Sequence, residues 1–314
     1  MSTILDAVVP LFAVIFAGFI AGRMRMISEE HVRGLNNFVF TFAMPVMLFK
    51  LMASTNVLEV GEWRFVAGFL YGELLVFLAG GIVGAVIFRQ RFTEMTMQGF
   101  GSTFCNGVLI GLPLVIGLFG EKGAIPAALL FTLDVVIFSV ITVLLEMGRS
   151  DKPAMRSSPL ITVSLAMLRN PILMSTLIGI CWGILEWPIP SLISNTFGFL
   201  GQAGPPAALF ALGATLAYRR IAGSIGSASF MVLFKLLLHP LAAFLILTYL
   251  VPVGPFWVYT AVIFAACPVG ANVYVFAQQY QVSVTTASTA ILVSTGLSLM
   301  TITALLLMFP PIAL

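Results

Sequence analysis

The sequence predicts an all-helical membrane protein with ten transmembrane helices, arranged as two inverted five-helix repeats in which the fourth and ninth helices are broken. Of the 314 residues, 60% are hydrophobic and 9% are charged, whereas a typical soluble domain is roughly 45–50% apolar and about 25% charged. The chain contains ten long apolar runs, and its two halves share a pattern at a fixed spacing. This composition excludes a cytosolic enzyme and a nucleic-acid-binding protein.

The ten expected spans are apolar runs bounded by Gly, Pro or charged residues. A helix needs about 20 apolar residues to cross a bilayer, and ten such helices with short connectors account for the whole length. The spans are expected at residues 4–21, 35–53, 64–88, 98–119, 124–148, 171–187, 191–218, 228–251, 257–279 and 284–309.

Basic residues are distributed unevenly between the two sets of connectors. Eleven of the 15 Lys and Arg residues follow the first, third, fifth and seventh spans, three lie in the other connectors, and Lys235 lies within a span. Lys and Arg concentrate in cytoplasmic connectors. We therefore expect a multi-pass protein of the cell membrane with both termini on the outer face.

The two halves of the chain resemble each other at an offset of 161 residues. Since each half holds five spans, an odd number, the second copy must be inverted in the membrane, which is typical of secondary transporters. The expected organisation is a first repeat at 1–148, a cytoplasmic basic connector at 149–170 and a second repeat at 171–314. The matched positions are Pro10 with Pro171, Gly18 with Gly179, and the motif Pro-x-x-Leu-Phe-x-Leu at Pro45 with the same motif at Pro206.

Pro, Gly and Asn occur together in the middle of the fourth and ninth spans. Pro removes a backbone donor, Gly tolerates unwound backbone, and such a break persists only beside protein or a water-filled cavity. The N-termini of half-helices suit an anion, to which an Asn amide can also donate. Simple helix packing is the alternative for each residue taken singly. The candidate substrate-binding residues are Asn106, Gly107, Gly111, Pro113, Pro268, Gly270 and Asn272.

Four ionisable residues lie within the expected spans and are candidates for proton coupling. A charge inside a membrane is costly and marks a functional hypothesis. Glu73 is the first candidate, while Asp134 is equally consistent with a packing residue. Lys235 and His239 lie four residues apart on one helix face. Lys235 either snorkels to the cytoplasmic surface or pairs with an acid or the substrate, and a lone histidine is more often a packing residue.

Several kinds of chemistry lack their sequence signatures. The chain has no Gly-x4-Gly-Lys-[Ser/Thr] loop for a nucleotide and no HExxH pair for zinc. Two histidines and three scattered cysteines do not provide a metal site, and an odd cysteine count predicts no disulfide framework. We therefore expect no enzyme activity, no cofactor and no bound metal.

A series of motifs, in order along the whole chain, resembles the auxin efflux carrier family. The family includes plant auxin exporters and bacterial permeases for malate, malonate and similar carboxylates, and this chain looks more like the compact bacterial members. The motifs are Asn36-Asn-Phe-Val-Phe with Met47-Leu48-Phe49 around Pro45, Asn106-x4-Gly111-x-Pro113-Leu114, Asn170-Pro171, Leu209-Phe210-Ala-Leu-Gly213-Ala214 and Pro268-x-Gly270-x-Asn272.

The resemblance implies a fold like that of the bile-acid sodium symporters. Spans one, two, six and seven would form a scaffold and a homodimer, while spans three to five and eight to ten would form a moving transport domain. Pro113 and Pro268 would be the crossover prolines, Asn106 and Asn272 the polar positions beside them, and Glu73 the acid of the third span.

The sequence as a whole predicts a secondary active transporter that moves a small organic anion, a mono- or dicarboxylate, by an elevator-type mechanism. Proton-linked or facilitated movement is favoured, because the crossover has few polar side chains for a cation. A sodium-coupled organic anion symporter is the alternative, and a membrane receptor for the same ligand comes third. The lipid bilayer is the expected environment, and no nucleic acid is expected as a partner.

Overall fold

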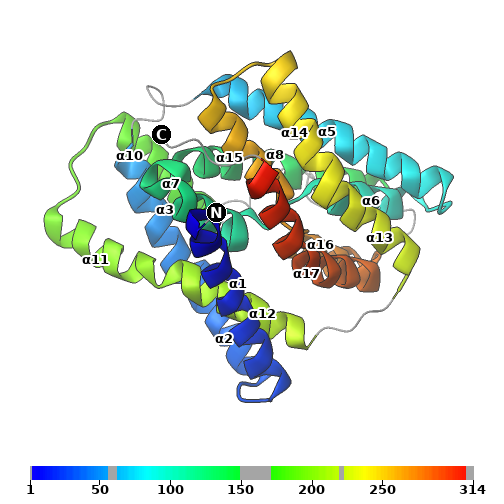
Figure 1. Cartoon of the computed structure of the whole chain (residues 1–314), viewed down its shortest axis with the longest axis horizontal. Helices are drawn as coiled ribbons and strands as arrows, with labels where there is room; N and C mark the ends of the chain where they lie inside the picture. The colour runs from blue at the N-terminus through cyan, green and yellow to red at the C-terminus, as the bar shows by residue number, and fades with distance from the viewer. Residues whose placement is uncertain (1, 56–61, 149–170, 219–222, 309–314) are drawn as a thin grey trace. The chain divides into compact units, whose positions relative to one another are not determined.

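The computed structural model describes residues 2–55, 62–148, 171–218 and 223–308, and most residues within these ranges are helical (Figure 1). The basic connector predicted at 149–170 lies outside the described residues. Helices occupy all ten ranges expected to be spans. Five of the described helices are long and apolar enough to cross a membrane: Glu29–Ala53, Trp63–Val86, Ala124–Met147, Ile225–Leu250 and Val284–Met308.

The chain divides into two compact units, and each takes segments from both halves of the sequence. Unit 1 comprises Met1–Gly61, Val108–Val135 and Ser164–Tyr218, and unit 2 comprises Glu62–Gly107, Val136–Val163 and Arg219–Leu314. The boundary between the units falls within helix α8 (Ala124–Met147).

Unit 1 is built on two closely packed helix pairs, α1 with α12 and α3 with α10. Gly18 of α1 abuts the carbonyl of Phe210 in α12, and a Cβ built on Gly179 of α10 would lie 2.8 Å from the carbonyl oxygen of Phe49 in α3. No side chain fits at either glycine. The bounds are α1 Ser2–Arg23, α2 Glu29–Phe38, α3 Met44–Ala53, α7 Leu112–Phe119, α10 Pro171–Ile184, α11 Ser191–Gln202 and α12 Gly204–Ala217.

Unit 2 contains α6, which precedes one interruption, α15 and α16, which flank the other, and the long helical segments Trp63–Val86, Ile225–Leu250 and Val284–Met308. Within it α5 packs on α6 and α14, α14 packs on α15, and α13 packs on α17. The bounds are α5 Trp63–Val86, α6 Phe92–Thr103, α13 Ile225–Leu233, α14 His239–Leu245, α15 Pro255–Ala266, α16 Ala271–Tyr280 and α17 Val284–Met308.

Three π-helical turns each end shortly before a proline. A proline ring clashes with the carbonyl four residues earlier, and a π turn, with its longer i to i+5 hydrogen bonds, accommodates that clash without ending the helix. These turns explain how apolar runs containing proline remain helical. They are η1 Val39–Ala43 before Pro45, η2 Gly107–Gly111 before Pro113 and η4 Phe234–Leu238 before Pro240; a further π turn, η5 Ile246–Leu250, and the 3₁₀ turn η3 Gly120–Gly123 complete the described elements.

Candidate functional site

Two short extended segments pair in unit 2, and we call this place the crossover. Helix α6 ends at Thr103, α15 ends at Ala266, and Cys105 and Val269 form an antiparallel bridge between the segments that follow. The Asn106 N–H donates to the Pro268 carbonyl at 2.8 Å, and the Gly270 N–H donates to the Phe104 carbonyl at 2.9 Å. Each helix break therefore supplies the hydrogen-bond partners that the other break needs.

Gly270 is required at the crossover because the two backbones approach closely. A Cβ at this position would lie 2.7 Å from the Cys105 carbonyl oxygen and would also meet the Phe104 ring. Gly270 is also the N-cap of α16, with extended backbone. The ring of Phe104 packs in turn against those of Phe100 and Phe138, both at 5.1 Å between centroids.

The break after α15 separates a backbone N–H and a carbonyl that would bond to each other in a continuous helix. Two side chains provide hydrogen bonds to these groups instead. In a continuous helix the Val269 N–H would donate to the Ala265 carbonyl four residues earlier. Instead, the Ala265 carbonyl accepts from the Lys235 ammonium, and the Val269 N–H donates to the Ser294 hydroxyl at 3.1 Å. A buried backbone group without a partner costs free energy, so Lys235 and Ser294 both stabilise the interruption.

Asn106 places a buried amide beside the break. The residue is 5% exposed, and its Nδ2 has no hydrogen-bond partner. Leaving a buried donor unsatisfied costs about 1–3 kcal/mol. Asn272, the second residue of α16, is exposed instead. The two asparagines expected as a symmetric pair are therefore in different environments.

Lys235, His239 and Glu73 lie together in unit 2. Lys235 and His239 are fully buried, and the Lys235 ammonium is 3.1 Å from Nδ1 of His239. The His239 ring packs against Phe69 of α5 at 5.4 Å between centroids. Glu73 lies one turn beyond Phe69, is 6% exposed and is within electrostatic range of Lys235. Snorkelling, one of the two interpretations of Lys235, is wrong because the side chain is enclosed by protein.

The remaining predicted residues are distributed over both units. Gly107 and Gly111 begin and end η2, directly after Asn106. Pro113 lies in the first turn of α7, in unit 1. The expectation that Pro113 marks the break is therefore corrected: the fourth span is interrupted at 104–106, where pairing with the second segment holds the chain extended. Asp134 belongs to unit 1, whereas Glu73 belongs to unit 2.

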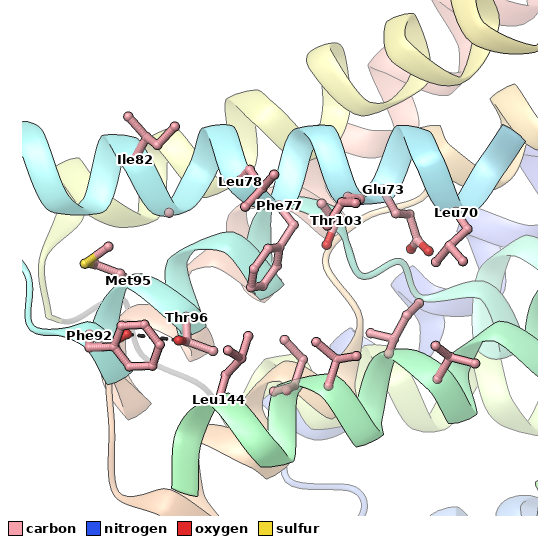
Figure 2. Close-up of a pocket in the computed structure, with 16 residues that line it drawn as sticks. Leu70, Glu73, Phe77, Leu78, Ile82, Phe92, Met95, Thr96, Thr103 and Leu144 are labelled. Carbon is pink, nitrogen blue, oxygen red and sulfur yellow. Dashed lines mark hydrogen bonds between the residues drawn. The ribbon is translucent and has the colours of Figure 1, made fainter. Parts of the chain in front are cut away.

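A groove of about 400 Å³ runs between α5, α6 and the second half of α8, all within unit 2 (Figure 2). Leu70 and Glu73 lie toward one end, and Phe92 and Met95 lie toward the other. Its other lining side chains are apolar apart from Thr96. Among the described residues, no three His, Cys, Asp or Glu side chains come together as metal ligands.

Sequence reasoning missed two contributors to the crossover. Ser294 is one of several serines and threonines on α17, and nothing in its neighbours along the chain distinguishes it. The hydrogen bond from Lys235 to Ala265 joins residues 30 positions apart. A lysine within an apolar helix was a signal in the sequence for a buried charge. The carbonyl that accepts its hydrogen bond, however, can be identified only from the fold.

Apolar helices of membrane length, interrupted around a buried polar site, are the features of a membrane transport protein. The sequence profile of a family described as membrane transport protein matches residues 3–306. The chain belongs to this family, the auxin efflux carrier family, which confirms the resemblance in its motifs.

Several relatives match over most or all of this chain. A Rhizobium meliloti (strain 1021) protein named "Putative malonate transporter" is 34% identical, over 98% of this chain and 96% of its own. "Auxin efflux carrier component 8" of Arabidopsis thaliana is 23% identical, over 92% of both chains. The "Lysosomal cholesterol signaling protein" of Mus musculus is 26% identical over 99% of this chain, which spans only 38% of that longer protein.

Proposed function

We propose that this membrane transporter is a secondary carrier of a small organic anion, a mono- or dicarboxylate, and that the crossover binds it. The observation that carries the proposal is the buried, unpaired amide of Asn106 beside two paired helix breaks. The name of the Rhizobium meliloti relative supports a dicarboxylate such as malonate among the candidates.

The chemistry of the crossover suits an anion better than a cation. The first N–H groups of a helix have no partner within it, and they carry a partial positive charge. Helix α16 begins at this place, and Asn106 adds a neutral donor. The Ala265 carbonyl lies at the C-terminal end of α15, and it already accepts a hydrogen bond from Lys235.

The position of Lys235 also bears on coupling. A sodium ion at a helix break would require free oxygen ligands, and the ammonium group already occupies one of them. We therefore favour proton-linked or facilitated movement over sodium coupling. Glu73 is the leading candidate for the proton carrier because it lies in the wall of the groove and within electrostatic range of Lys235. His239 is the second candidate.

The proposal includes the wider architecture. The protein has ten spans in two inverted repeats, with both termini on the outer face. It forms a homodimer through spans one, two, six and seven, and the unit that carries the crossover moves in an elevator-type mechanism. The repeat is supported by the glycine contacts in unit 1. Gly18 meets Phe210 and Gly179 meets Phe49, and the 161-residue offset converts one contact into the other.

Uptake into proteoliposomes tests the function. Purified protein should accumulate radiolabelled malonate or a related carboxylate, and Asn106→Ala should weaken uptake while Asn195→Ala, an exposed asparagine of unit 1, should leave it unchanged. Imposed gradients of pH or sodium identify the coupling ion. Binding without flux would favour the receptor, dependence on sodium alone would favour the symporter, and neither binding nor flux across a carboxylate panel would refute the proposal.

A further inference from the structure

The groove between α5 and α8 is a surface feature distinct from the crossover residues that bind the proposed anion. Side chains from one face of α5, among them Leu74, Leu78 and Ile82, form one wall, and Val136 and Val140 of α8 help form the other (Figure 2). Each of these five side chains is between 46% and 60% exposed. The groove is therefore open along its length, and the described part of the chain does not fill it.

The chemistry of the walls selects a hydrocarbon occupant. Sixteen residues line the groove, and only Glu73, Thr96 and Thr103 carry polar side chains. The Thr96 hydroxyl already donates to the Phe92 carbonyl at 2.9 Å. A concave apolar surface on a helix of membrane length is in contact with lipid chains rather than water.

The length of the groove matches one leaflet of a bilayer. Leu70 and Ile82 lie at its two ends on α5, and twelve residues at about 1.5 Å each give about 18 Å. The hydrocarbon core of a bilayer is about 30 Å thick, so one leaflet is about 15 Å. Glu73 lies near the middle of α5, which places the groove between the bilayer centre and the turn that joins α5 to α6.

Positive charge lies at the surface end of the groove. Arg89 and Arg91 are exposed residues of the turn immediately before Phe92, which lines the groove. Glu94, in the first turn of α6, accepts a hydrogen bond from the Arg91 backbone N–H at 2.9 Å. Basic residues near a membrane surface attract anionic lipid headgroups. Arg89 and Arg91 therefore present two guanidinium groups at this end of the groove.

We propose that this groove binds one acyl chain of an anionic phospholipid, with the phosphate of its headgroup held by Arg89 and Arg91. The chain lies along α5 toward Glu73, within the leaflet on the side of the α5–α6 turn. The site therefore binds a lipid molecule selectively, in addition to the general contact that the apolar surface makes with the bilayer.

Native mass spectrometry of delipidated protein titrated with phosphatidylglycerol or phosphatidylcholine tests the proposal. The wild type should retain one phosphatidylglycerol per chain. Leu78→Trp and Val140→Trp, which fill the groove from opposite walls, should each abolish this peak. Val86→Trp, an exposed residue of α5 outside the groove, should keep it. The two groove variants change different helices, and a monodisperse elution profile verifies that each is folded.

The headgroup is tested separately. Arg89→Gln and Arg91→Gln should each lower the preference for phosphatidylglycerol over phosphatidylcholine by about fivefold, while Arg64→Gln at the opposite end of α5 should not change it. Equal retention by Leu78→Trp and Val86→Trp would overturn the groove assignment, and equal binding of both lipids by the wild type would overturn the headgroup assignment. Displacement of the lipid peak by malonate would also overturn the proposal, because the groove would then belong to the substrate path.

Discussion

Substituting Gly270 by alanine tests whether the paired breaks hold unit 2 together. An ideal Cβ would lie 2.7 Å from the Cys105 carbonyl oxygen, so the two segments must separate by about 0.3 Å to relieve the clash and by about 0.7 Å to restore ordinary contact at 3.4 Å. That shift strains both crossover hydrogen bonds, from Gly270 to Phe104 and from Asn106 to Pro268.

The magnitude follows from those two bonds. Each contributes about 0.5–1.5 kcal/mol when made, and a buried group left without a partner costs about 1–3 kcal/mol. Gly270→Ala should therefore lower the free energy of unfolding by about 2–4 kcal/mol. Tightening of the Phe104 ring against its neighbours adds to the loss.

The assay is denaturant or thermal unfolding of purified protein in detergent, with Gly296→Ala as the matched control. Gly296 lies in α17, and a Cβ there meets nothing within 4 Å, so the control should be neutral or stabilised by about 0.5–1 kcal/mol. If Gly270→Ala unfolds at the same free energy as Gly296→Ala, the pairing of the two breaks does not stabilise the fold as argued.

Four further substitutions address the site. In a thermal-shift assay, Asn106→Ala should reduce the stabilisation that a bound carboxylate gives by about 1–3 kcal/mol. Asn272→Ala should reduce it less, because this residue is exposed. An equal effect of the two substitutions would contradict the different roles of the two asparagines. Glu73→Gln should remove the response of uptake to an imposed pH gradient while carboxylate binding survives, and an unchanged response would exclude Glu73 as the proton carrier. Lys235→Met should lower the free energy of unfolding by about 1–3 kcal/mol, since it removes the donor to the buried Ala265 carbonyl. A variant as stable as the wild type would show that the hydrogen bond is not structurally required.

The helices and the approximate places of the interruptions could be predicted because their signals are local. Apolar runs, glycines and Pro268 influence the backbone conformation only of residues close to them in the sequence. Pro113 was misleading for the same reason: a proline usually breaks a helix, yet the π turn η2 precedes it and α7 follows. The break lies at 104–106 because the partner segment at 268–270 supplies hydrogen bonds there, and no rule based on neighbouring residues contains that information.

The candidate site could be predicted only in part. Asn106 was found through its position beside glycines, but its burial and the exposure of Asn272 depend on the surrounding helices. Glu73 and Lys235 were each identified as costly intramembrane charges. Their proximity depends on the packing of α5 against α14, which relates residues more than 160 positions apart in the sequence.

The π turns before Pro45, Pro113 and Pro240 have a consequence for comparing this chain with its relatives. A π turn contains one residue more than the α-helical path it replaces. A relative that lacks both the proline and the turn should therefore be one residue shorter at that point. Aligning the two sequences without a gap would rotate every later position of the helix by about 100°, assigning core residues to lipid and lipid-facing residues to the core.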